Sequence, residues 1–88
     1  MIARTPADLG RLIRARRRAL GLGQQELADR VGVSRLWIVE FERGKPRAEV
    51  GLVLRTLTAL GLALDVSEEE EGSGEPAAAP SRATRARR

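Results

Sequence analysis

Five side chains between residues 34 and 40 carry groups that can recognise the edges of nucleic-acid bases. An arginine can donate two hydrogen bonds to guanine O6 and N7, a carboxylate can accept from cytosine N4, and aliphatic side chains can contact thymine methyl groups. The candidates for base reading are Ser34, Arg35, Leu36, Val39 and Glu40. Because phosphates repel a carboxylate, Glu40 has two alternative roles: it orients Arg35, or it excludes wrong bases.

The residue types that the chain lacks exclude most other chemistry. Its 88 residues include no histidine and no cysteine. This composition removes the usual general base, the commonest metal ligand and any thiolate site or disulfide. We therefore predict that the protein is not an enzyme and has no catalytic residues, no metal site and no cofactor. The length allows a single small domain.

A helix, a tight turn and a second helix would position the base-reading residues. The two helices are predicted over 24–31 and 35–43, because apolar residues recur there at helical spacing. These apolar residues are Leu27, Ala28, Val31, Ile38 and Phe41. Between the helices, Gly32 can adopt the left-handed conformation that ends a helix, and Ser34 is a good N-cap. The pattern is typical of a helix-turn-helix, whose second helix fits a DNA major groove.

Two further helices flank this unit. Thr5, Pro6 and Asp8 are typical of a helix start, which predicts a helix from there to about Leu20. Another helix is predicted to begin near 48–50 and to reach Leu60. The predicted inward residues are Leu9, Leu12, Ile13 and Leu20 in the first, and Val50, Val53, Leu54, Leu57 and Leu60 in the last. The first also carries Arg11, Arg14, Arg16, Arg17 and Arg18, which form either a solvated basic face or phosphate contacts.

Residues 23–44 resemble the Xre/Cro-like family of DNA-binding proteins. The residues that meet the family pattern are Gln24, Leu27, Ala28, Gly32, Val33, Ser34, Ile38, Glu42 and Gly44, within a resemblance that covers about residues 9–61. The resemblance implies a lambda-repressor-like fold of four to five helices. It also implies that Gln24 binds a phosphate with help from the helix dipole, and that Arg17 and Glu42 form an ion pair. Gly23 departs from the family, which usually has Ser or Thr at this helix cap.

Three more residues near the two central helices are candidates for phosphate binding. Gln25 follows Gln24 at the start of its helix, and Arg43 lies at the end of the second helix. Trp37 has two alternative roles, because its ring can pack beside the loop after the second helix or its indole N–H can bind a phosphate.

A short strand is predicted after the last helix. Leu62, Leu64 and Val66 alternate with Ala63 and Asp65, which is the spacing of a strand with one apolar face. One strand cannot satisfy its own backbone groups, so we predict that residues 62–66 pair with the same strand of a second subunit. The alternative is a frayed extension of the chain.

The composition changes at Ser67. Residues 67–88 are acidic, then rich in Gly, Pro and Ala, then basic, which predicts a disordered tail after a folded domain at 1–66. The net charge of +4 is concentrated in the domain, where 12 Lys and Arg face 7 Asp and Glu. A basic domain of this kind favours binding to phosphates.

Together these features predict an all-α, dimeric, sequence-specific DNA-binding repressor. Its expected partner is an inverted-repeat operator in double-stranded DNA. Within the family, the short chain and the LALDV segment resemble HipB-like antitoxins, which implies autoregulation and a kinase-like toxin partner. The alternatives are a stand-alone Xre-type regulator and an adaptor that does not bind DNA. The chain shows no signal peptide and no apolar run long enough for a membrane, so we expect a cytoplasmic protein without membrane contact.

Overall fold

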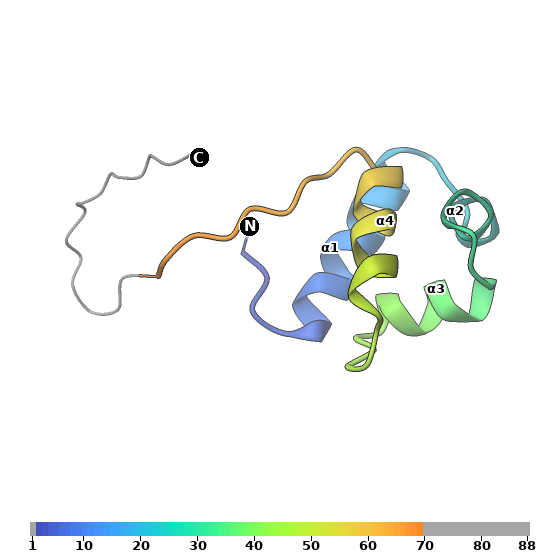
Figure 1. Ribbon diagram of the computed structural model, residues 1–88. Coiled ribbons are helices and arrows are strands. Elements are labelled where there is room, and N and C mark those ends of the chain that lie inside the picture. The colour runs from blue at the N-terminus through green and yellow to red at the C-terminus, as the bar shows by residue number, and fades with distance from the viewer. Residues whose placement is uncertain (1, 70–88) are drawn as a thin grey trace.

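The computed structural model describes residues 2–69, which form four helices in the predicted order (Figure 1). They are α1 (Pro6–Ala19), α2 (Gln24–Val31), α3 (Arg35–Glu42) and α4 (Val50–Ala59). α3 contacts both α1 and α2, and α4 packs against α2. The predicted all-α helix-turn-helix fold is confirmed. Within the described residues, no helix combines the length and the apolar character needed to cross a lipid bilayer.

The buried core joins the four helices around the helix-turn-helix. Its members are Ile13, Leu27, Ala28, Val31, Ile38, Phe41, Leu57 and Leu60. All five apolar residues that were predicted to face inward from the two central helices are among them. The face of α3 opposite Ile38 and Phe41 consequently lies outside the core.

Three residues that were predicted to face inward are instead exposed. Leu20, Val50 and Leu54 are 44%, 69% and 41% exposed. Leu20 lies beyond the last turn of α1 as its C-cap, and α4 turns a different edge toward the core. That edge includes Thr56, which is fully buried and whose hydroxyl is satisfied by donating to the carbonyl of Leu52 at 2.7 Å.

Local capping explains why the helices begin and end where they do. The hydroxyls of Thr5 and Ser34 each accept an N–H of the following helix at 3.0 Å. Gly32 ends α2 in the left-handed conformation, with φ of 89°. Gly23 has no side chain to cap α2, but its own N–H donates to Glu26 at 2.8 Å. Half of a capping box therefore stabilises the start of α2.

A close backbone contact between α1 and the end of α3 depends on Gly10. A Cβ at this position would lie 2.5 Å from the carbonyl oxygen of Phe41 and 2.6 Å from that of Glu42. We expect Gly10→Ala to lower the free energy of unfolding by about 1–3 kcal/mol, because α1 must move away from α3. Urea unfolding measures this change. In the matched control Gly51→Ala, where the added Cβ meets nothing within 4 Å, stability should not fall. A Gly10→Ala variant as stable as the wild type would contradict the expected clash.

After α4, residues 62–69 form an irregular extended segment that runs near the N-terminal residues (Figure 1). Leu62 packs against the core, whereas Leu64 and Val66 are 62% and 84% exposed. Arg4 and Glu69 form an ion pair between the two ends of the described chain. The predicted strand requires a second subunit, so it stays a prediction. Most of the predicted disordered tail, from residue 70 on, lies outside the described residues.

Candidate nucleic-acid interface

The outward face of α3 presents a mixed set of polar and apolar groups. Arg35 and Glu40 are exposed and Val39 is half-buried. Leu36 is 63% exposed, so its apolar surface is not used in the fold. Ser34 is exposed as well, although its oxygen caps α3. All five predicted base-reading residues therefore lie on or beside one accessible helix face.

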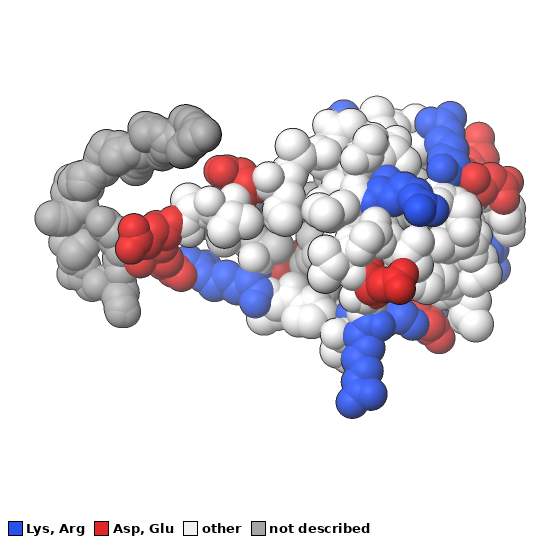
Figure 2. Space-filling model, in the orientation of Figure 1, with Lys and Arg blue, Asp and Glu red and all other residues white. Residues whose placement is uncertain are grey.

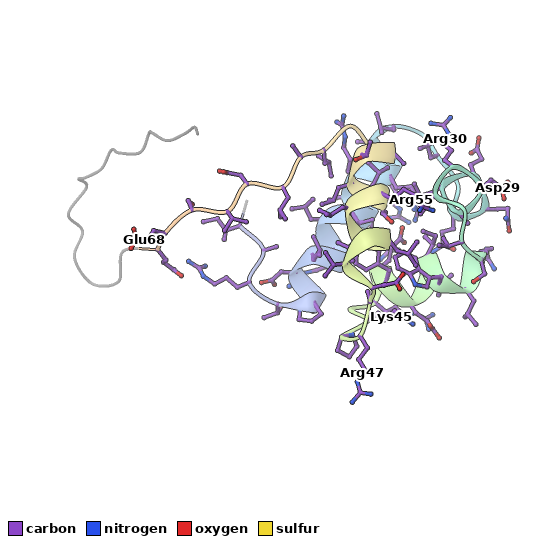
Figure 3. All side chains as sticks on the ribbon, viewed as in Figure 1. Asp29, Arg30, Lys45, Arg47, Arg55 and Glu68 are labelled. Carbon is purple, nitrogen blue, oxygen red and sulfur yellow. The ribbon has the colours of Figure 1, made fainter. Side chains whose placement is uncertain are left out.

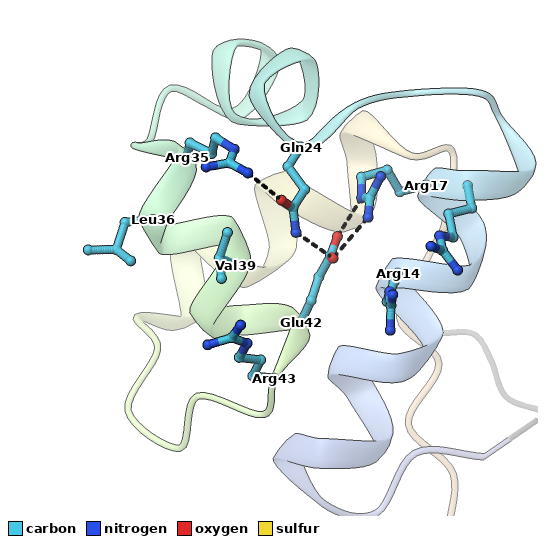
Figure 4. A pocket seen from close by; sticks show the side chains of 9 residues that line it. Arg14, Arg17, Gln24, Arg35, Leu36, Val39, Glu42 and Arg43 are labelled. Atoms are coloured by element: carbon cyan, nitrogen blue, oxygen red, sulfur yellow. Dashed lines mark hydrogen bonds and ion pairs between the residues drawn. The ribbon is translucent and has the colours of Figure 1, made fainter.

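A hollow of about 610 Å³ borders this face (Figure 4). It lies between α1, the start of α2 and α3, and its lining residues are Arg14, Arg17, Arg18, Gln24, Arg35, Leu36, Val39, Glu42 and Arg43. Five arginines and a single carboxylate give the lining a strong excess of positive charge. A concave basic surface of this kind raises the local concentration of an anionic partner.

Arg17 and Glu42 form a two-point ion pair at the inner wall of the hollow (Figure 4). The Nε–Oε2 and Nη2–Oε1 distances are 2.6 and 3.1 Å, and the side chains are only 9% and 3% exposed. The Nη1 atom of Arg17 also donates to the carbonyl of Leu22 at 2.8 Å. The hydrogen bond to Glu42 is the largest effect on the pKa of Arg17 and raises it above its ordinary value; burial opposes the rise, and the charge of the carboxylate adds to it. The pair joins α1 to α3.

Gln24 connects this ion pair to the exposed end of α3. Its Nε2 atom donates to Oε1 of Glu42 at 3.1 Å, and its Oε1 atom accepts from Nη2 of Arg35 at 3.3 Å. Figure 4 shows these two bonds and those between Glu42 and Arg17 as one connected series. The second Nε2 hydrogen donates to no other described residue.

The other predicted phosphate-binding residues occupy different settings. Arg43 is exposed and lines the hollow. Gln25 is exposed at the start of α2, where its amide donates to Asp29 at 2.8 Å. The half-buried ring of Trp37 lies 5.0 Å from that of Phe41, at an angle of 53°, and packs against the core. These contacts are with the core, and they test neither packing beside the loop after α3 nor a bond from the indole N–H to a phosphate.

Two arginines of α1 bond to neighbouring groups away from the hollow, and three others line it. Arg11 pairs with Asp8 at 2.6 Å, and Arg16 donates to the carbonyl of Leu60 at 2.9 Å. Arg14 and Arg18 are exposed and line the hollow beside Arg17. Their spacing of three and four residues places them on one helix face, which is the sequence signal that could have selected them.

Lys45, in the loop between α3 and α4, is a functional candidate that sequence reasoning missed (Figure 3). Its ammonium lies 3.0 Å from Oε1 of Glu40. The structure therefore pairs Glu40 with Lys45, whereas Arg35 is bonded to Gln24. Because the pair is partly exposed, it is weak enough to open when a ligand approaches.

Comparisons with known proteins agree with this geometry. A family model described as "Helix-turn-helix domain" matches residues 8–70. The uncharacterized HTH-type transcriptional regulator y4mF of Sinorhizobium fredii is 46% identical over 63 residues, which span 72% of this chain and 83% of the relative. The restriction-modification controller protein C.AhdI of Aeromonas hydrophila is 32% identical with a TM-score of 0.60, over 65% of this chain and 83% of that one.

HipB is similar in fold at a lower sequence identity. Its structure in a complex with an O4 20mer has a TM-score of 0.73 and 21% identity to this chain. The match covers 80% of this chain and 99% of the HipB chain. HipB has also been solved in a HipA–HipB–O2–O3 complex, with the same score.

Proposed function

The chain belongs to the helix-turn-helix domain family of transcriptional regulators, and from this premise we propose that it is a dimeric repressor of a specific operator. The observation that carries the proposal is the basic hollow beside the exposed face of α3. A positive concave surface next to an unused helix face is the arrangement that lets one helix enter a major groove while arginines bind the adjoining backbone.

The proposed backbone contacts come from residues around the hollow beside α3. Arg14, Arg18 and Arg43 line this hollow and would bind phosphates that flank the groove. Gln24 lines it too, and the start of α2 offers open N–H groups beside Gln24 and Gln25, where a helix N-terminus favours an anion. These contacts supply affinity and orientation without sequence preference.

The proposed base contacts come from the first two turns of α3. Arg35 donates to the guanine O6 and N7 atoms, while Leu36 and Val39 contact thymine methyl groups. Lys45 pairs with the Glu40 carboxylate and neutralises its charge as the protein approaches the phosphates. Glu40 accepts from cytosine N4 only after this pair has separated. The indole N–H of Trp37 is the least supported phosphate contact, since its ring packs against the core.

Replacing Arg35 is expected to relax the sequence preference at one base position. Selection from a randomised duplex library identifies the preferred site, and fluorescence anisotropy then measures affinity for duplexes that each differ by one base pair. Arg35→Ala should reduce the binding free energy by about 1–3 kcal/mol for the preferred site. The control Arg30→Ala removes an exposed charge from α2 outside the hollow (Figure 3). Unchanged affinity and unchanged preference in Arg35→Ala would contradict this docking.

We further propose that the protein is an antitoxin that also binds a kinase-like toxin. The similarity of its fold to HipB and the presence of HipB in a complex with HipA support this role. Co-purification with the product of the neighbouring downstream gene tests this role. A chain that binds its own promoter but no such product is a stand-alone regulator. A chain that shifts no promoter fragment is an adaptor, which the basic hollow argues against.

A further inference from the structure

The way in which α3 ends holds Lys45 beside Glu40. The N–H of Lys45 donates to the carbonyl of Glu40 at 3.0 Å, and the N–H of Gly44 donates to the carbonyl of Phe41, also at 3.0 Å. Gly44 has the left-handed conformation that such a helix end uses, with φ of 96°. These two bonds define a Schellman motif, which brings the residue after the glycine next to the third-last residue of the helix. The backbone therefore keeps the lysine near the carboxylate.

An ion pair occupies the place where this motif usually has an apolar contact. The Nζ atom of Lys45 lies 3.0 Å from Oε1 of Glu40, and the two side chains are 26% and 46% exposed. Within residues 2–69, the structure gives Glu40 no second ion pair. A lysine ammonium sits on a flexible four-carbon stem, so it can turn to another anion without any change in the backbone.

We propose that Lys45 is a specificity-determining residue, which exchanges Glu40 for a DNA phosphate only when Glu40 accepts a hydrogen bond from cytosine. The inference rests on the proposed function, in which Glu40 reads that base. At any other base, opening the pair would leave the carboxylate without a donor beside phosphates of the same charge. At a cytosine, the N4 amino group replaces the ammonium as the partner of Glu40, and Lys45 is released to the DNA backbone.

This exchange links a base contact to a phosphate contact, and the link has a signature in the salt dependence of binding. Each phosphate that a cation neutralises steepens the plot of log K against log [salt] by about 0.9. If Lys45 reaches a phosphate only at cytosine, the slope should be steeper by about 0.9 for the cytosine duplex than for a duplex with another base there. A lysine that always binds a phosphate, or never does, gives equal slopes.

The experiment uses the full chain and the single-base duplex set. Fluorescence anisotropy measures affinity at several salt concentrations between about 50 and about 200 mM, a range in which phosphate contacts strongly affect affinity. Glu40→Ala identifies the cytosine, because it should relax the preference at that position alone. The preference of the wild type for this cytosine should then fall about 3.5-fold from the lowest to the highest salt concentration, as the difference in slope requires.

Variants of the pair should remove the difference in slope in opposite ways. Lys45→Met has no charge to release, so both duplexes should show the shallower slope. Glu40→Ala leaves Lys45 free for a phosphate at every base, so both should show the steeper slope. The pair is exposed and weak, so both variants should fold. The control Arg47→Met removes an exposed cation from the same loop (Figure 3) and should preserve the difference.

Equal slopes for the two duplexes with the wild type would overturn the exchange and leave the proposed function standing. A difference that persists in Lys45→Met would also overturn it, because another cation would then be responsible. A Glu40→Ala variant that relaxes no base position would overturn it too, since Glu40 would read no base. A wild type that selects no sequence would instead overturn the proposed function, and the exchange with it.

Discussion

Glu42→Ala is expected to lower the free energy of unfolding by about 3–5 kcal/mol, because it leaves the buried guanidinium of Arg17 without its counter-charge. The carboxylate of Glu42 is 3% exposed and holds Arg17 at 2.6 and 3.1 Å. A small domain is stabilised by only about 5–15 kcal/mol in total. The variant should therefore unfold at a much lower temperature or urea concentration than the wild type.

A double-mutant cycle tests whether the two residues act as a unit. Arg17→Ala should be at least as damaging, since it also removes the bond to the carbonyl of Leu22. The double alanine variant should lose less than the sum of the two single losses. As a control, Glu40→Ala breaks the more exposed pair with Lys45, which should contribute no more than about 1 kcal/mol. Additive losses at Arg17 and Glu42 would mean that the pair contributes nothing of its own.

The helices could be predicted from the sequence because their signals are local. Thr5 and Ser34 cap the helices that follow them, and Gly32 ends α2 in the left-handed conformation. The inward face of each helix was harder to predict. Residue spacing identifies an apolar stripe along a helix but does not show which edge of that stripe packs against the core. Val50 and Leu54 were assigned inward and are exposed, while the polar Thr56 is buried.

The candidate site divides in the same way. Helical spacing placed Arg35 and Leu36 on the outward face of α3, since the core residues of that helix define the opposite side. The resemblance implied one contact between helices, the ion pair of Arg17 and Glu42, but the bonds of Gln24 had no such signal. They depend on distances that only the packed helices establish, and the pairing of Glu40 with Lys45 depends on the course of the loop after α3. Sequence resemblance suggested a phosphate role for Gln24, and the structure adds its connection to Arg35.

The segment after α4 leaves the backbone and apolar groups of the predicted strand without partners among the described residues. Residues 63–69 make no backbone–backbone hydrogen bond to any described residue. Leu64 and Val66 are exposed, whereas Leu62 is held against the core. An antiparallel pairing of 62–66 with a second copy would satisfy the backbone groups and cover both apolar side chains. Two-fold symmetry would also place two α3 helices on one side for an inverted repeat with half-sites about 10 bp apart.

Leu64→Pro is expected to abolish or greatly weaken this dimer while the helices stay folded. Proline removes a backbone donor and restricts φ in the middle of the strand. The variant should keep its helical far-UV spectrum and sediment mainly as a monomer at micromolar concentration. Operator affinity should fall about 100-fold or more, because two half-sites bound by linked subunits gain that much over one. The control Ser67→Pro lies beyond the predicted strand and should sediment like the wild type.

The competing dimer surface is α4, where Val50 and Leu54 are exposed. On the side of the molecule where α4 faces the viewer, Figure 2 shows white surface interrupted by blue and red side chains. Leu54→Ser distinguishes the two surfaces, since it removes apolar area from α4 without touching the strand. If the strand forms the contact, Leu54→Ser should remain dimeric while Leu64→Pro does not. The reverse pattern, a tight Leu64→Pro dimer and a monomeric Leu54→Ser variant, would assign the interface to α4. Symmetry would then have to align the two α3 helices through helix packing instead of strand pairing.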